Sequence, residues 1–463
     1  MCGVYGVWGV REAAHVAHLG LYALQHRGQE SSGIVSIDGA GDTHVHRSMG
    51  LVQEIFTPEV LNRLPGEIAI GHTRYSTAGV SAIAEAQPCI VNYHAGPLSL
   101  AHNGNLTNAR RLRDDLVRTG SIFQSTSDSE VIVHLIARSE ARQPEDQILD
   151  ALERVEGAYS LVMTLGRSLY AIRDPAGFRP LVLGKLGDGY VVGSETCSMD
   201  IVGAQLIREL QPGEWIKISD NGLEELPPLP PRPVKRCVFE LIYFSRPDSV
   251  VFGESVDRAR RDLGRRLAVE HPAPGADCVF SVPDSANAMA LGYAEESGIQ
   301  LEYGLIRNHY VGRTFISPGQ RARTEKARIK FNPVRGIVDG KSVVVVDDSL
   351  VRGTTSHSLI RMIRHAGARE IHLRIASPPI TGPCYYGINT PTREELIAAN
   401  CSVEEIRAHL EVETLAYLSL EGTHAAISGT GSGFCDACFS GNYPTEVPED
   451  ARAEEMDIPL GVK

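Results

Sequence analysis

Short apolar runs separated by polar turns follow one another through the first half of the chain. Such runs predict strands that lead into polar turns. The predicted strands cover residues 33–39, 67–77, 97–105, 158–166, 168–174, 180–186, 189–195 and 213–220. Many strands with a few helices among them favour sheets packed against helices over a coiled coil or a repeat array.

Two stretches of this half have the spacing of helices instead. Residues 14–27 place apolar side chains with helical periodicity, and Gly28 is expected to act as the C-cap. A second helix is expected to begin at Ser127, because Ser127 and Glu130 form the Ser-x-x-Glu pattern of a capping box. The first half is therefore predicted to be of the α+β class.

A proline-rich stretch, residues 225–233, separates this half from the next and should be extended and semi-rigid. After it, predicted helices and strands alternate, and residues 342–349 contain a continuous apolar strand, as in a parallel sheet covered on both faces. This alternation predicts a doubly wound α/β domain, whose ligands bind at the carboxyl ends of the strands. From about Pro444 the chain is acidic and weakly patterned, which predicts a loosely docked tail.

Composition narrows the classes of function. The 463 residues carry 45 Lys and Arg against 57 Asp and Glu, so the net charge is −12, which argues against a broad face for nucleic acid or an anionic membrane. No apolar run approaches the roughly 18 residues that span a bilayer, and no signal peptide is visible, which predicts a cytoplasmic protein. Nine cysteines in a reducing compartment indicate catalysis, metal binding or burial more than disulfide bonds.

Cys2 directly follows the initiator methionine. If Met1 is removed, one residue carries both a thiol and a free α-amine, and this amine, with a pKa of roughly 7.7–8.0, can act as the base that activates the thiol. The same position also fits a small apolar residue at the start of a buried strand, because free cysteines are usually buried. Position alone leaves both interpretations open.

Residues 343–356 carry a second chemical pattern, in which an apolar strand runs into Asp347 and Asp348. Adjacent carboxylates repel each other, so they favour a cation or sugar hydroxyls as partners. Gly353 lets the backbone approach a ligand, and the first turn of the next helix offers free N–H groups beside three hydroxyls. The pattern indicates a Mg²⁺-bound, phosphorylated ribose, with a solvated acidic turn as the alternative.

A Walker A phosphate loop is excluded just upstream. Gly340-Lys341-Ser342 resembles the end of that motif, but Arg335 stands where its first glycine should be. The tripeptide also precedes a strand, whereas a Walker A loop follows one.

The stretch 343–356 resembles the fingerprint of type I phosphoribosyltransferases, which use 5-phosphoribosyl-1-pyrophosphate (PRPP). The resemblance implies that Asp347 and Asp348 bind the ribose hydroxyls and Mg²⁺, and it places Ser285 near the metal. It assigns the 5′-phosphate to Arg352, Gly353, Thr354, Thr355 and Ser356. The basic stretch 309–331 resembles the loop that closes over PRPP, with Arg313 and Lys330 as phosphate contacts; a solvated basic loop is the alternative.

Five segments of the first half resemble class II glutamine amidotransferases, which have an N-terminal-nucleophile fold. The segments are residues 2–4, 26–30, 71–77, 102–105 and 127–130. Arg74 can clamp the carboxylate of glutamine, and Asp128 can pair with its ammonium group. Asn103 and the backbone N–H of Gly104 can hold the oxyanion that forms when Cys2 attacks the amide.

A glutaminase joined to a PRPP site resembles the glutamine phosphoribosylpyrophosphate amidotransferase family over nearly the whole chain. The resemblance implies an αββα N-terminal-nucleophile sandwich at residues 2–230, a type I phosphoribosyltransferase domain at 231–445 and an acidic tail at 446–463. The implied reaction converts glutamine, PRPP and water to 5-phosphoribosylamine, glutamate and pyrophosphate, the first committed step of purine (IMP) synthesis. Ammonia passes internally from Cys2 to C1 of PRPP. Purine nucleotide inhibitors and a homotetramer are also implied.

Two rival functions agree less well with these residues. The first is a regulator that binds PRPP without catalysis, and the glutamine-binding set argues against it, because a sensor has no use for a glutamine pocket. The second is a glutaminase that aminates a different acceptor, and the PRPP fingerprint argues against that.

Four cysteines resemble the ligands of the branch of this family that carries a 4Fe–4S cluster. They are Cys237, Cys384, Cys435 and Cys438. The last two form a C-x-x-C motif, which alone fits zinc, a cluster or a redox pair. Four thiolates meet the usual requirement of a cluster, and zinc is the alternative, because all-cysteine zinc sites are common. We expect a structural or oxygen-sensing cluster that ties the linker, the second domain and the tail together.

Overall fold

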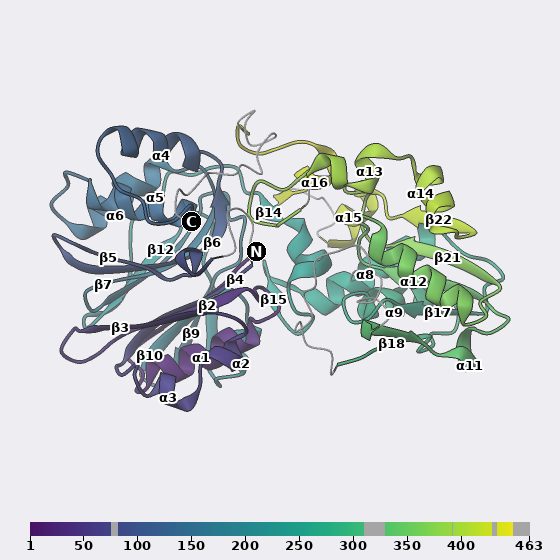
Figure 1. Ribbon diagram of the computed structural model, residues 1–463, viewed down its shortest axis with the longest axis horizontal. Coiled ribbons are helices and arrows are strands. Elements are labelled where there is room, and N and C mark those ends of the chain that lie inside the picture. Colours follow the sequence, from purple (N-terminus) through teal and green to yellow (C-terminus); the bar gives the residue numbers. More distant parts are fainter. Residues whose placement is uncertain (76–81, 310–328, 391, 428–432, 448–463) are drawn as a thin grey trace.

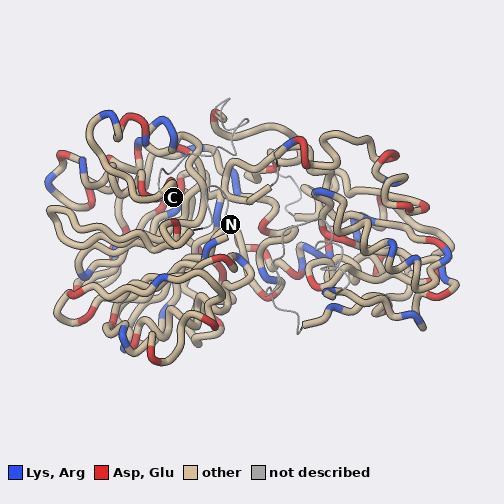
Figure 2. Tube along the Cα trace, viewed as in Figure 1, with Lys and Arg blue, Asp and Glu red and all other residues tan. Residues whose placement is uncertain are grey.

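The computed structural model describes residues 1–75, 82–309, 329–390, 392–427 and 433–447, which form two lobes lying side by side (Figure 1). The strands of the first lobe, at the left of Figure 1, end at Glu225, and the second lobe follows the proline-rich stretch. Basic and acidic residues are interspersed along both lobes (Figure 2). No helix among the described residues has the length and apolar character needed to cross a membrane.

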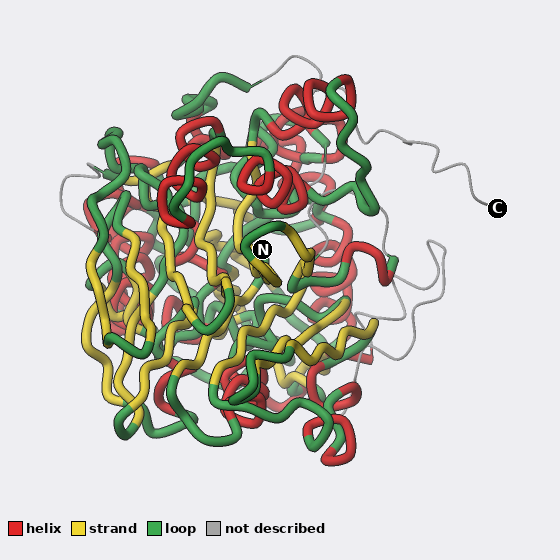
Figure 3. Tube along the Cα trace, turned by 90° about the vertical axis from the view of Figure 1, so that its left-hand side faces the viewer, coloured by secondary structure: helices red, strands yellow, loops and turns green. Residues whose placement is uncertain are grey.

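Two antiparallel sheets form the centre of the first lobe, and strands are yellow in Figure 3. One sheet has the order β11 (Gln205–Glu209), β9 (Val182–Leu186), β10 (Gly189–Gly193), β1 (Gly3–Trp8), β4 (Ile68–Arg74), β2 (Ser31–Ile37), β3 (Thr43–Met49). The other has the order β13 (Gly222–Glu225), β12 (Trp215–Ser219), β8 (Ser168–Arg173), β7 (Gly157–Leu165), β6 (Gly96–Leu106), β5 (Cys89–Tyr93). They stack face to face, because Val4 and Ile70 of one sheet share a buried apolar cluster with Val162 of the other.

Helices cover the outer faces of both sheets. The β1 sheet is covered by α1 (Ala13–Ala23), α2 (Val52–Ile55) and α3 (Pro58–Leu61), and the β6 sheet by α4 (Ala109–Arg118), α5 (Asp128–Ala137) and α6 (Pro144–Arg154) (Figure 1). Two short helices, η1 (Ile83–Glu85) and α7 (Cys197–Asp200), complete the lobe. The layers are those of the predicted αββα sandwich.

The predicted helix over residues 14–27 is too long at its C-terminal end. α1 ends at Ala23, and residues 24–27 continue as turns. Gln25 accounts for this end, because its side-chain amide donates to the carbonyl of Gly28 at 2.5 Å and accepts the N–H of Val52 at 2.6 Å.

The predicted helix start at Ser127 is confirmed, but the capping box is wrong. Ser127 is the N-cap of α5, and its hydroxyl accepts the N–H of Ser129 at 3.2 Å. Glu130 turns away from the cap and accepts the N–H groups of Gln124 and Ser125 at 2.7 and 2.8 Å. Its carboxylate therefore fixes the loop before the helix instead of the helix end.

A four-stranded parallel sheet forms the centre of the second lobe. Its order is β17 (Cys278–Ser281), β20 (Ser342–Asp347), β21 (Glu370–Ile375), β22 (Thr414–Tyr417). On β20, Val344 and Val346 pack with α8 (Val256–Glu270) and α9 (Asn287–Ser297), whereas Val343 and Val345 pack with α12 (Thr354–His365) and α14 (Val403–Leu410). Cover on both faces explains the continuous apolar run of this strand and agrees with the predicted α/β class.

Short elements complete the second lobe and join it to the first. They are β14 (Arg236–Cys237), η2 (Glu240–Phe244), β15 (Val250–Val251), β16 (Glu254–Ser255), β18 (Leu305–Arg307), β19 (Phe331–Pro333), α11 (Arg335–Val338), η3 (Arg393–Glu395), α13 (Ile397–Asn400), α15 (Leu420–Ile427), β23 (Phe434–Cys435) and α16 (Ala437–Ser440). β14 pairs in parallel with β23, which sets Cys237 opposite Cys435. The predicted domain limits stay predictions, and most of the tail, residues 448–463, lies outside the described residues.

Candidate active sites and the segment between them

Cys2 lies directly before β1, the central strand of its sheet, and is buried. Its backbone N–H donates to Asn103 Oδ1 at 3.2 Å, and its Sγ lies 3.9 Å from the carbonyl oxygen of Tyr75. Its own carbonyl accepts the Nε–H of Arg27 at 3.0 Å. Cys2 thus lies at the start of a buried strand and contacts Asn103, one of the predicted oxyanion residues, while its role as the nucleophile stays a prediction.

Asn103 and Gly104, the predicted oxyanion pair, lie on β6 beside Cys2. The Nδ2 of Asn103 is buried and has no hydrogen-bond partner among the described residues. A buried donor without an acceptor costs about 1–3 kcal/mol, so this N–H is available to an acceptor on the substrate. Only glycine fits at 104, because a Cβ there would lie 1.9 Å from the carbonyl oxygen of Ala158.

Arg74, at the end of β4, is the predicted clamp for the glutamine carboxylate. It is buried, and its Nη1 lies 3.1 Å from Glu30 Oε1. Asp128, the first residue of α5, accepts the N–H of Leu106 at 2.9 Å, and its Oδ1 lies 3.5 Å from His102 Nδ1. Burial raises the pKa of Asp128, but His102 and these hydrogen bonds outweigh burial and hold it below its usual range. Asp128 is therefore ionised at neutral pH, as an ammonium partner must be.

A buried charge cluster lies behind Cys2, and the sequence interpretation assigned no role to it. Arg27 Nη1 lies 2.5 Å from Glu195 Oε1, and Arg27 Nη2 lies 2.8 Å from Glu240 Oε1, with all three side chains fully buried. His26 pairs with Glu195 at 2.8 Å, and Arg179 lies 3.5 Å from Glu240. Because Glu240 belongs to η2, this cluster connects the carbonyl of the Cys2 residue to the segment that leads into the second lobe.

The two predicted ribose acids follow β20 in the second lobe. Asp347 ends the strand, and the hydroxyl of Ser285 donates to Asp348 Oδ2 at 2.5 Å. Burial and the charge of Asp348 raise the pKa of Asp347 well above its usual value, and burial also raises that of Asp348. A cation is the partner that would restore charge to both carboxylates. Ser285 thus lies against Asp348, and its predicted place near a metal stays a prediction.

The loop after these acids leads into a helix, as the sequence predicts, and its role as an anion cradle stays a prediction. Gly353 has a φ of +74°, which favours glycine, and α12 begins at Thr354, with Thr355 and Ser356 in its first turn. Arg352 pairs with Glu395 at 2.8 Å, and the Nζ of Lys330 lies 5.0 Å from the centre of the Phe331 ring. Arg313 lies outside the described residues.

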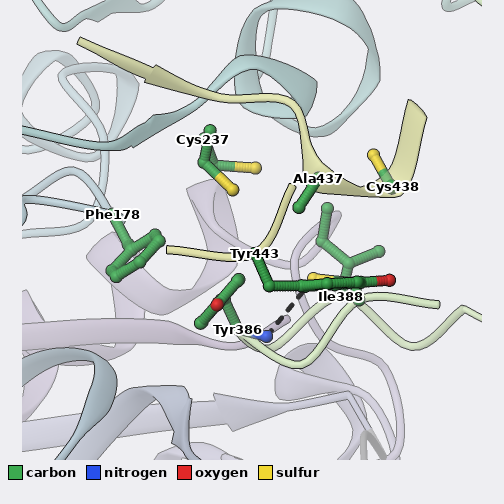
Figure 4. A pocket seen from close by; sticks show the side chains of 9 residues that line it. Phe178, Cys237, Tyr386, Ile388, Ala437, Cys438 and Tyr443 are labelled. Atoms are coloured by element: carbon green, nitrogen blue, oxygen red, sulfur yellow. Dashed lines mark hydrogen bonds between the residues drawn. The ribbon is translucent and has the colours of Figure 1, made fainter. Parts of the chain in front are cut away.

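Figure 4 shows the pocket that the four cysteines share. Its wall consists of Cys237, Cys384, Cys435 and Cys438 together with Phe178, Tyr386, Ile388, Ala437 and Tyr443. All four are free thiols. Burial raises the pKa of Cys237 to about 11, although Arg179 acts in the opposite direction. Within the described residues, no group of three or more His, Cys, Asp or Glu side chains is already arranged to hold a metal ion.

Known proteins are similar to this chain over most of its length. A family model described as a glutamine amidotransferase domain matches residues 72–200. The amidophosphoribosyltransferase of Bacillus subtilis (strain 168) is 49% identical over 456 residues, which cover 97% of this chain and 95% of that protein. The chain belongs to the amidophosphoribosyltransferase family. Another member, the chloroplastic amidophosphoribosyltransferase 2 of Arabidopsis thaliana, is 49% identical over 97% of this chain and 80% of its own.

Solved amidophosphoribosyltransferase structures have the same fold. A structure described as the allosteric regulatory enzyme of purine biosynthesis superposes with a TM-score of 0.92 at 48% identity, over 97% of each chain. The Bacillus subtilis glutamine PRPP amidotransferase complexed with ADP and GMP gives a TM-score of 0.91 at 47% identity, over 98% of this chain and all of that one. The predicted fold class and the predicted amidophosphoribosyltransferase activity are therefore confirmed.

Proposed function

We propose that, within this activity, Cys2 is the nucleophile that releases ammonia from glutamine and that Asn103 and Gly104 stabilise the oxyanion. The observation that carries this proposal is the buried Nδ2 of Asn103, which lacks an acceptor in the described residues although Asn103 Oδ1 is engaged by Cys2. A tetrahedral intermediate on Cys2 would supply the missing acceptor. Preorganised donors of this kind contribute most where charge develops in the transition state.

Removal of Met1 belongs to this proposal. With Met1 in place, burial lowers the pKa of its amine to about 5, so a charged amine is poorly tolerated in this position. After removal, the amine sits on Cys2, where the nitrogen already lies 3.2 Å from Asn103 Oδ1. That oxygen would then orient the amine as the base for its own thiol. A mass spectrum of the purified protein that shows mostly retained Met1 together with full glutaminase activity would contradict this step.

Two charged side chains would bind the α-carboxylate and the α-ammonium group of the substrate glutamine. Arg74 would bind the carboxylate, and the ionised Asp128 would bind the ammonium group. Glu30 already pairs with Arg74, which keeps the guanidinium in place between turnovers. Ammonia-dependent synthesis should therefore be unaffected by Arg74→Ala, whereas the KM for glutamine should rise.

The second half-reaction, attack of ammonia on C1 of PRPP, would take place in the second lobe. Asp347 and Asp348 would bind the ribose hydroxyls, and the loop 352–356 would bind the 5′-phosphate through N–H groups and hydroxyls. Mg²⁺ would be held by these two carboxylates with Ser285 close by, and when bound it supplies charge neutralisation for the pyrophosphate. Lys330 and Arg313 are proposed as further phosphate contacts.

Two substitutions separate the half-reactions. Cys2→Ala should abolish phosphoribosylamine formation from glutamine but leave formation from ammonia intact, because the PRPP site is separate. Asp347→Asn should lower both rates, because both end at C1 of PRPP. A Cys2→Ala protein that still used glutamine would refute the nucleophile assignment, and an Asp347→Asn protein with normal PRPP kinetics would refute the ribose site.

The four-cysteine pocket is proposed as the site of a 4Fe–4S cluster. The donor set fits, since four free thiols line one pocket whose remaining wall is mainly apolar and aromatic. When bound, such a cluster would cross-link β14, β23 and the segment around Cys384. Iron and acid-labile sulfide should be present in anaerobically purified protein and lost in Cys438→Ser. Colourless protein with stoichiometric zinc would favour the alternative ligand instead.

Regulation, assembly and location are proposed from the family. The Bacillus subtilis relative was solved with ADP and GMP, which supports purine nucleotides as inhibitors of this enzyme too. The homotetramer and the cytoplasmic location stay predictions. A light-scattering mass of four chains would bear out the first.

A further inference from the structure

A short segment of the second lobe, residues 384–388, lies directly against the predicted oxyanion strand of the first lobe. Gly387 makes the closest approach: a Cβ at this residue would lie 2.9 Å from the carbonyl carbon of Gly104, 3.0 Å from its oxygen and 3.1 Å from its Cα. Carbon atoms in ordinary contact are about 3.5–4.0 Å apart. Any residue larger than glycine at position 387 would therefore displace the backbone of Gly104.

Several further contacts fix the 384–388 segment on the first lobe. Asn105 Nδ2 donates to the carbonyl of Tyr385 at 3.0 Å, and Arg179 Nε donates to the carbonyl of Tyr386 at 3.0 Å. The rings of Phe178 and Tyr386 stack with their centres 4.4 Å apart and their planes 16° apart. Two backbone carbonyls and one ring of the segment are thus held by β6 and by the loop between β8 and β9.

Gly104 is confined from two directions as a result. A Cβ on Gly104 would meet the carbonyl of Ala158, and a Cβ on Gly387 would meet the backbone of Gly104. The Cα and the carbonyl group of Gly104 therefore have little room to shift, and the N–H of Gly104 is bonded to this same Cα. Oxyanion donors must lie about 2.7–3.1 Å from the developing charge, so a displacement of a few tenths of an ångström matters.

We propose that Gly387 is a positioning residue for glutamine hydrolysis: the 384–388 segment of the PRPP lobe holds the N–H of Gly104 in its oxyanion-binding position. The proposal rests on the proposed oxyanion role of Asn103 and Gly104. A segment of the second lobe would then take part in glutamine hydrolysis, which occurs in the first lobe. The segment begins at Cys384, so the same short stretch of backbone lines the four-cysteine pocket and contacts the oxyanion strand.

The decisive variant is Gly387→Ala, which adds one methyl group against Gly104. Removal of a whole oxyanion donor costs about 10²–10³-fold in kcat, so a displaced donor should lower the kcat for glutamine hydrolysis about 10-fold or more. The KM for glutamine should stay within about twofold, because Arg74 and Asp128 are untouched. Ammonia-dependent phosphoribosylamine synthesis should also be unchanged. Equal losses in both assays, or a change in KM alone, would overturn the proposal.

Gly441→Ala is the matched control. Gly387 has a φ of +105°, and Gly441, three residues after Cys438 in the chain, also has a positive φ, +77°, but a Cβ at Gly441 would meet no atom within 4 Å. Gly441→Ala places an alanine at a positive φ without the contact, so glutamine kcat should stay at the wild-type value. A loss in Gly441→Ala equal to that in Gly387→Ala would mean that strain near the pocket, and not contact with Gly104, causes the effect.

Two further measurements test whether a loss in Gly387→Ala comes instead from misfolding or from a defect at the Cys2 thiol. Asn105→Ala adds no atoms and removes the hydrogen bond to Tyr385, so it should lower glutamine kcat in the same direction; an unchanged kcat would count against the proposal. Alkylation of Cys2 by iodoacetamide, followed on the Cys2 peptide by mass spectrometry, needs no oxyanion and should proceed at the wild-type rate in Gly387→Ala. A slowed alkylation would place the defect at the thiol and overturn the proposal.

Asn103→Ala separates this proposal from the one on which it rests. If Asn103→Ala keeps its glutamine kcat, the oxyanion assignment itself fails. If Asn103→Ala lowers kcat but Gly387→Ala does not, only the positioning role fails.

Discussion

Arg27→Met should destabilise the first lobe far more than deletion of an exposed ion pair. The guanidinium is fully buried and touches two carboxylates, Glu195 at 2.5 Å and Glu240 at 2.8 Å, as well as the carbonyl of Cys2 at 3.0 Å. Methionine approximates the length of the side chain but brings no charge. The substitution therefore leaves two ionised groups inside the protein without their shared partner.

The expected loss follows from what remains around the two carboxylates. Removing one partner of a buried ion pair costs about 3–5 kcal/mol, because the other charge stays desolvated. Glu195 keeps His26 at 2.8 Å, and Glu240 keeps Arg179 at 3.5 Å. Because each carboxylate keeps one partner, we expect the free energy of unfolding to fall by the cost of one unpaired charge and not by the sum of two. A change of about 3–5 kcal/mol is a large part of the 5–15 kcal/mol that is typical of a folded protein.

Urea unfolding followed by tryptophan fluorescence would measure this loss. The only two tryptophans of the chain, Trp8 and Trp215, lie on β1 and β12, so the signal reports on the first lobe. Arg118→Met is the control, since Arg118 and Asp115 form an exposed pair on α4 of the first lobe, for which about 0–1 kcal/mol is expected. If Arg27→Met lowered the free energy of unfolding by less than about 1 kcal/mol, the conclusion that the buried charge cluster stabilises the first lobe would be wrong.

Two other substitutions test the packing and the electrostatics of the fold. Burial raises the pKa of Glu130, but hydrogen bonds from His134, Ser125 and the N–H of Gln124 outweigh burial and lower it to about 2. The ionised carboxylate therefore stabilises the fold at pH values above the unfolded pKa of about 4.3, and this stabilisation is lost as the pH falls towards about 2. Glu130→Gln removes this pH dependence and should flatten the acid side of a Tm–pH profile. An unchanged slope would refute the argument. Gly264→Ala would place a Cβ 1.9 Å from the carbonyl oxygen of Met289, between α8 and α9, and should cost about 1–3 kcal/mol in thermal unfolding. Gly336→Ala, where a Cβ meets no atom within 4 Å, should cost much less, and equal losses would contradict the packing argument.

Features that depend on neighbouring residues in the chain were predictable from the sequence. The run of valines in β20 predicted a strand covered on both faces, and the acids that follow it predicted a site at its carboxyl end. The strand β3 was missed because it lies at a sheet edge, where exposed and half-buried residues alternate in a polar sequence. Its hydrophobic pattern is too weak to be distinguished from a loop.

Features that depend on distant residues were not predictable from local patterns. Arg27 meets Glu195 and Glu240 across 168 and 213 residues, and an isolated arginine or glutamate in the sequence is most often exposed. Gly387 and Gly104 lie even farther apart, and neither glycine is distinguished from the other glycines of the chain by its neighbours. Only the resemblance to a family grouped the four cysteines, because a single C-x-x-C motif leaves its partners open.

The contacts between the lobes restrict where the enzyme can move during ammonia transfer. Separating the lobes at Arg27 would pull its guanidinium from Glu240, and each would then be a buried charge that has lost its partner. From Glu240 the contacts continue to Ser245 at 2.8 Å and, through the carbonyl of Ser245, to Arg260 at 2.7 Å in α8. The residues behind Cys2 are thus connected by hydrogen bonds and ion pairs as far as α8 of the second lobe. A second set of contacts, between the 384–388 segment and Gly104 and Asn105, reaches the glutamine site from the same lobe, so a change in the second lobe has two direct routes to the residues around Cys2.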